Sequence, residues 1–138
     1  MATTLWVAVG GAIGSVARYW VAVLVARLTG PDFPWGTILI NISGSFIIGV
    51  FFAVTAEVAG RWQVTNDFKV FLMAGLCGGF TTFSAFSLQT LGLLRDGRMA
   101  AALANIALSV VLCIAAVAIG YSSGSQLNAS APSQSGDR

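Results

Sequence analysis

Residues 70–94 read VFLMAGLCGGFTTFSAFSLQTLGLL, a run of 25 residues without a single charged side chain. A helix needs about 20 predominantly apolar residues to cross the hydrocarbon layer of a bilayer. Backbone polar groups inside that layer must be paired within the segment or by close protein neighbours, which favours a helix. The stretch therefore predicts a membrane-spanning helix.

Three further runs of this kind flank it. Residues 35–56 and 99–121 carry no charge, and residues 5–26 carry only Arg18. Of the 138 residues 57% are hydrophobic and 9% are charged, against about 25% charged in soluble domains. We expect an all-α membrane protein with one transmembrane domain over residues 1–121, whose four helices lie at about 4–27, 35–57, 68–95 and 98–121. Residues 122–138 are small and polar, and we expect a disordered tail there.

The charges at the ends of the spans are nearly balanced. With four spans, the first and third loops share one side of the membrane, and the termini and the second loop share the other. Positive residues close to the membrane set orientation. The first side carries Arg27, Arg95 and Arg98, and the second carries Arg61, Lys69 and the distant Arg138. Two interpretations stay open: a weakly encoded orientation, or dual topology, in which copies insert both ways and pair antiparallel.

Small residues recur at four-residue spacing in three of the predicted spans. Such spacing lets helix backbones approach closely in lipid, where no hydrophobic effect drives association. It predicts a packed bundle, and because four helices enclose little space, an oligomer is the natural way to complete a pathway. The pairs are Gly10 with Gly14, Ser45 with Gly49, and Gly75 with Gly79.

Few polar residues interrupt the spans, and these are the functional candidates. A charge at the centre of a span costs about 2.5–3.5 kcal/mol on insertion scales, so Arg18 either snorkels to the interface or faces water or an anion. Asn41 lies near the middle of the second span, where it either joins helices or serves a site. The spans contain no carboxylate and no histidine, so a proton relay has no obvious chemistry.

The hydroxyls and phenylalanines of residues 78–89 lie in the third span. Gly78-Gly79 followed by Thr81-Thr82 predicts a break in the helix, which would present backbone carbonyls to a cation. Beyond it, Phe80, Phe83 and Phe86 recur every three residues along one helix face. Their positive ring edges could receive a small dehydrated anion. For the phenylalanines alone, an aromatic packing stripe is the favoured interpretation.

Three motifs together resemble the Fluc (CrcB) family of fluoride channels: GGAIGSVAR at 10–18, WGTILINISGSF at 35–46 and GGFTTFSAFS at 78–87. The resemblance covers all four spans in order and spacing. It implies an antiparallel, dual-topology homodimer in the bacterial inner membrane that lets fluoride leave the cell passively. It also implies a structural sodium ion at the dimer centre, and no nucleic-acid partner.

The resemblance also assigns roles to individual residues. It implies that Phe83 and Phe86 line the pore, that Asn41 hydrogen-bonds the ion, and that Arg18 lies near an aqueous vestibule. Backbone carbonyls of the metal site are implied at Gly78 and Thr81, and hydroxyls of a polar track along the pore at Ser84, Ser87 and Ser109. The chain departs from the family pattern at Ala85, Gln89, Asn105 and Cys113, where threonine, glutamate, tyrosine and serine are usual.

Two rival classes share some of these features. A small multidrug exporter has similar length and helix number, but it needs an intramembrane carboxylate, and the first span offers only Arg18. A non-transporting assembly protein would explain the glycines but not Asn41 together with the phenylalanines. No nucleophile–base pair or metal cluster supports an enzyme, and none is expected.

Overall fold

The computed structural model describes residues 2–55 and 65–129, and in these ranges all regular structure is helical. The predicted loop residue Arg61 and positions 130–138 of the predicted tail lie outside the described residues. Four stretches are long and apolar enough to cross a membrane, as predicted, so the chain is a multi-pass membrane protein. The elements are α1 (Ala2–Thr29), α2 (Trp35–Val54), α3 (Asn66–Val70), the π-helix η1 (Phe71–Cys77), α4 (Gly78–Phe80), α5 (Phe83–Arg95) and α6 (Met99–Ala129).

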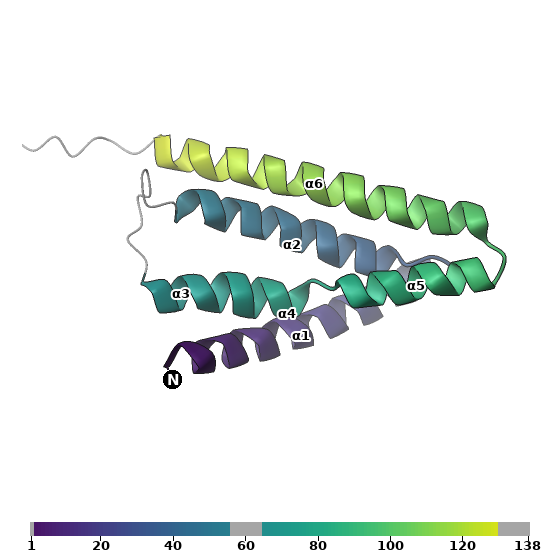
Figure 1. Cartoon of the computed structure of the whole chain (residues 1–138), viewed down its shortest axis with the longest axis horizontal. Helices are drawn as coiled ribbons and strands as arrows, with labels where there is room; N and C mark the ends of the chain where they lie inside the picture. Colours follow the sequence, from purple (N-terminus) through teal and green to yellow (C-terminus); the bar gives the residue numbers. More distant parts are fainter. Residues whose placement is uncertain (1, 56–64, 130–138) are drawn as a thin grey trace, which may run out of the picture.

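The four spans pack as two pairs. Helix α2 lies along α6, and α1 lies along η1 and α4 (Figure 1). Arg98, in the turn before α6, donates from Nη1 to the carbonyl of Asp32, in the turn before α2, at 2.7 Å. This bond holds the first and third loops at the same end of the bundle, as four spans require.

Glycines bring the paired backbones into contact, as the small-residue spacing predicted. A Cβ built on Gly10 would lie 2.6 Å from the carbonyl oxygen of Phe71, and one on Gly79 would lie 2.5 Å from that of Gly11. A Cβ on Gly49 would meet the backbone of Val117 across the α2–α6 pair. Only glycine permits this approach, so the glycines determine how close the helices lie.

The third span changes its backbone conformation along its length. After α3 it becomes a π-helix over seven residues, a feature that the sequence did not predict. Farther on, Thr81 (φ −81°, ψ 158°) and Thr82 (φ −153°, ψ 116°) are extended, between the end of α4 and the start of α5. Gly78 and Gly79, from which the sequence placed the break, are themselves helical.

The end of the last helix differs from the prediction. Residues 122–129 were expected in a disordered tail, but α6 continues to Ala129. The hydroxyls of Ser122, Ser123 and Ser125 each donate to the carbonyl four residues earlier, so these polar side chains are satisfied within the helix. A Cβ on Gly124 would lie 2.7 Å from the carbonyl oxygen of Val50, so this extension packs on α2.

Candidate functional site

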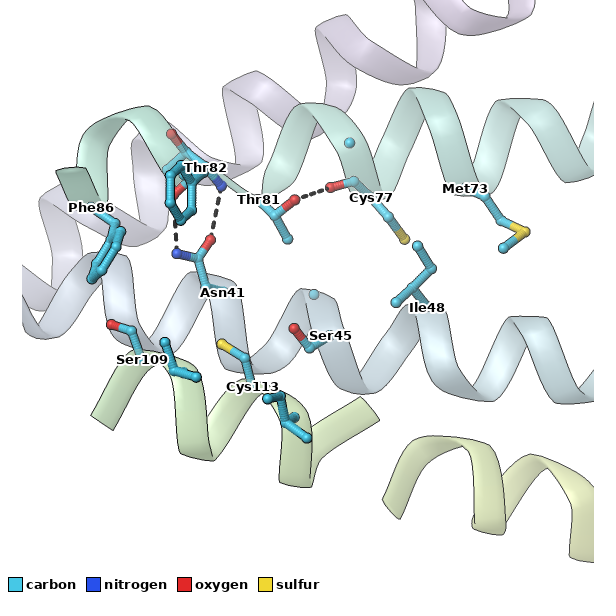
Figure 2. Close-up of a pocket in the computed structure, with 15 residues that line it drawn as sticks. Asn41, Ser45, Ile48, Met73, Cys77, Thr81, Thr82, Phe86, Ser109 and Cys113 are labelled. Carbon is cyan, nitrogen blue, oxygen red and sulfur yellow. Dashed lines mark hydrogen bonds between the residues drawn. The ribbon is translucent and has the colours of Figure 1, made fainter. Parts of the chain in front are cut away.

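A cavity of about 390 Å³ lies where α2, the third span and α6 meet. Six of the nine residues that the sequence singled out line it, and they come from three different spans. Figure 2 shows Asn41 of α2 pointing toward Thr82, with Ser45 farther along α2 and with Ser109 and Cys113 of α6 on a neighbouring wall. The six predicted residues are Asn41, Gly78, Thr81, Phe83, Phe86 and Ser109.

The amide of Asn41 binds the backbone of the extended pair. Its Nδ2 donates to the carbonyl of Thr82 at 3.1 Å, and its Oδ1 accepts from the Thr82 N–H at 2.8 Å (Figure 2). A side-chain amide offers one donor and one acceptor in the same arrangement as a peptide group. Thr82 is therefore paired as it would be by a neighbouring strand. Sequence analysis left a helix-joining and a site role open for Asn41; the structure shows that it joins two spans and lines the cavity.

Two side chains redirect the backbone donors that a continuous helix would use. In such a helix the N–H of residue i+4 donates to the carbonyl of residue i. Here the Thr82 N–H donates to Asn41, and the Ala85 N–H donates to Thr82 Oγ1 at 3.2 Å. The usual donors to the carbonyls of Gly78 and Thr81 are thereby withdrawn, and both residues border the cavity.

The predicted pore phenylalanines differ in exposure. The ring centroids of Phe83 and Phe86 lie 5.3 Å apart at an interplanar angle of 49°. Phe86 is only 9% exposed, whereas Phe83 is 78% exposed. Phe80 lies before the extended residues and packs near Gly44, where a Cβ would meet its ring at 3.3 Å. One phenylalanine is thus built into the chain's own core, and the other projects from it.

Three predicted site residues lie outside the cavity lining. Ser84 is exposed and lies 3.2 Å from Thr82 Oγ1, and Ser87, also exposed, donates to the carbonyl of Phe83 at 2.9 Å. Arg18 is half-buried on α1 and forms no hydrogen bond or ion pair within the described ranges. Within a single copy of the chain, these three residues therefore do not join the other predicted residues at the cavity.

Comparison with known proteins extends over most of the chain. Residues 5–121 match the family model described as CrcB-like protein, Camphor Resistance (CrcB). The chain belongs to the CrcB family. It is 56% identical over 117 residues to a protein of Methylocella silvestris named fluoride-specific ion channel FluC, covering 85% of this chain and 88% of that one. Proteins of the same name from Methylobacterium radiotolerans and Rhodospirillum rubrum are 53% and 51% identical over 119 residues, covering 86% of this chain and 82% and 92% of theirs.

This CrcB chain also contains a buried polar cluster in which sequence analysis had assigned only Ser109 to the site. Asn105 is fully buried, and its Nδ2 donates to Thr90 Oγ1 at 2.8 Å. Thr90 in turn donates to the carbonyl of Phe86, and Ser109 reaches Asn105 Oδ1 at 3.5 Å. The cluster therefore connects the Phe86 backbone with the cavity wall at Ser109. Asn105 was noted only as a departure from the family pattern; its place four residues before Ser109 on the same helix face was the available signal.

Proposed function

We propose that this chain is a fluoride-selective ion channel that lets fluoride leave the bacterial cytoplasm passively across the inner membrane. The observation that carries the proposal is the cavity in which the Asn41 amide, the Phe86 ring and the Ser109 hydroxyl meet at membrane depth. The names of the relatives support the same ion.

The lining suits a small anion that has shed its water. Asn41 supplies an N–H, Ser109 a hydroxyl, and the phenylalanines supply positive ring edges. Among residues 2–55 and 65–129, no carboxylate contributes to the lining, so an anion meets no like charge from them there. A multidrug exporter, the rival class, would need such a carboxylate for proton exchange. Passive conduction is the better fit.

A second copy of the chain would complete the site. Phe83 projects from the monomer with 78% of its surface exposed, at the edge of the cavity that it lines together with Phe86. The nearly even distribution of Lys and Arg between the two sides favours insertion both ways. These features support an antiparallel homodimer in which Phe83, Ser84 and Ser87 face the partner or the pore.

A structural sodium ion at the dimer centre is the second part of the proposal. Gly78 and Thr81 would hold it through their carbonyls, whose usual helical donors bind Asn41 and Thr82 instead. Carbonyl oxygens suit a hard monovalent cation, and an antiparallel axis would bring two such pairs together. The ion would neutralise the converging carbonyl dipoles.

Fluoride efflux from liposomes that contain only the purified protein tests the function. Internal fluoride is released by a potassium gradient with valinomycin and followed with a fluoride electrode, with protein-free liposomes as the blank. We expect rapid efflux that does not respond to a pH gradient. Efflux no faster than from empty liposomes would refute the channel proposal, and efflux that requires a proton gradient would refute passive conduction.

A further inference from the structure

We infer that Asn41 is a positioning residue for the cation site as well as part of the anion cavity. The inference rests on the proposed function, since it concerns the carbonyls proposed to hold sodium. It goes beyond an ion-binding role for Asn41, because it assigns the amide a second task through the backbone of another span.

The two hydrogen bonds to Thr82 are the basis of this assignment. Asn41 comes from α2 and Thr82 from the third span, 41 positions later, so the contact is purely tertiary. Thr82 is buried at 9% exposure, and without this amide its N–H would lack its partner at membrane depth. The N–H would then be available to return to the carbonyl of Gly78, four residues earlier, as in a regular helix. Asn41 therefore keeps the Gly78 carbonyl free for a cation.

The Thr82 side chain acts on the other carbonyl in the same way. Its Oγ1 accepts from the Ala85 N–H and caps α5, which removes the donor that Thr81 would otherwise meet. The Thr81 hydroxyl donates to the carbonyl of Cys77 at 2.9 Å, so its single proton is engaged there and not with the carbonyl of Gly78. Each proposed ligand carbonyl thus loses its helical donor to one side chain. Asn41 binds the N–H that would donate to Gly78, and Thr82 binds the N–H that would donate to Thr81.

The Asn41 side-chain amide takes part in both the proposed cation site and the anion cavity. Asn41 Nδ2 carries two N–H groups, and the bond to Thr82 uses one of them. The second is available to an anion in the cavity that Asn41 lines. Anion binding and the geometry of the cation site therefore share one rigid group, and a change at Asn41 should affect both.

Hydrogen exchange and sodium-dependent stability test the inference in the purified full-length protein. The variants are Asn41→Leu, which keeps the volume and removes both bonds, and Asn41→Asp, which keeps the acceptor for the Thr82 N–H. Ser45→Ala is the matched control, because Ser45 lines the same cavity one helical turn farther along α2. Exchange is followed in peptides that cover residues 81–85, and melting temperature is compared in sodium chloride and N-methylglucamine chloride.

We expect Asn41→Leu to change the exchange pattern of residues 81–85, because the Thr82 N–H loses its bond to Asn41, and to lose the sodium-induced rise in melting temperature. Asn41→Asp should keep the protection of the Thr82 amide, and Ser45→Ala should match the wild type in both measurements. Unchanged exchange and an unchanged sodium effect in Asn41→Leu would overturn the inference. A wild type that sodium does not stabilise would refute the cation site and this role with it, whereas failure of fluoride efflux alone would refute only the channel.

Discussion

The contact of α1 with the segment before Thr81 yields a prediction with an internal control. Gly14 faces this segment at backbone distance: a Cβ there would overlap the Leu76 carbonyl oxygen and lie 2.8 Å from the Phe80 nitrogen. A Cβ on Gly11, three residues earlier on the same helix, would meet nothing within 4 Å. Gly14→Ala and Gly11→Ala thus add the same methyl group to the same helix, once against the backbone of the third span and once into open space.

The expected difference follows from the distances and from helix propensity. Ordinary van der Waals contact begins at 3.4 Å, so the added Cβ and the Phe80 nitrogen must move apart by about 0.6 Å. This nitrogen is a backbone atom, so no change of side-chain rotamer can relieve the overlap. Overpacking of this kind costs about 1–3 kcal/mol. Replacing glycine by alanine inside a helix gains about 0.5–1 kcal/mol. We expect Gly11→Ala to be neutral or stabilising and Gly14→Ala to be destabilising.

The displacement should also reach the site, since Phe80 directly precedes the extended pair. Thermal unfolding in detergent measures the stability of both variants, and fluoride efflux from liposomes measures the function. Gly14→Ala should melt lower and conduct more slowly, while Gly11→Ala should conduct like the wild type. Equal melting temperatures and equal flux in the two variants would refute the close packing of α1 on α4.

Three further predictions concern the pore, the buried cluster and the topology. Phe83→Ile and Phe86→Ile should each remove most of the fluoride flux, because an aliphatic side chain lacks the positive ring edge. Wild-type flux in both variants would show that the rings serve packing and do not contact the ion. Asn105→Leu should lower stability by about 1 kcal/mol through the lost bond to Thr90, measured by unfolding in detergent. A single cysteine added to the third loop, in a background without Cys77 and Cys113, should be labelled from both sides of the membrane; one-sided labelling would contradict dual insertion.

Properties that depend on composition and local spacing could be predicted from the sequence. Four spans follow from the length of the uncharged runs, and the meeting of Asn41 with Phe86 follows from the motifs that the chain shares with its family, whereas Ser109 lies outside these motifs and was assigned by the wider resemblance. The link between Asn105 and Thr90 could not be predicted in the same way. It depends on how α5 turns toward α6 after the extended residues, which local pattern does not specify.

The length of α6 was mispredicted for a related reason. Residues 122–138 were expected to be disordered because a small, polar segment has too little apolar surface to fold, and its serines and glycines are also poor helix formers. Along α2, however, Gly124 permits close contact with Val50, and the serine hydroxyls bond within the helix. Tertiary packing outweighed the local propensity.

The extended Thr81–Thr82 pair shows most clearly why the site needs the whole bundle. The adjacent glycines are the weakest helix formers nearby, yet both are helical. Gly79 is small because α1 packs against it, whereas a Cβ on Gly78 would meet only the Met73 carbonyl oxygen, at 3.8 Å. The extended residues follow instead at the point where two other spans bind the backbone. Ser15 of α1 reaches the carbonyl of Gly79 at 3.4 Å, and Asn41 of α2 pairs with both polar groups of Thr82. A local loss of helix propensity costs about 1 kcal/mol per glycine, whereas an unpaired buried backbone group costs about 1–3 kcal/mol. The position of the extended residues is therefore decided by the partners that neighbouring spans provide, and one of these partners, Asn41, also lines the cavity.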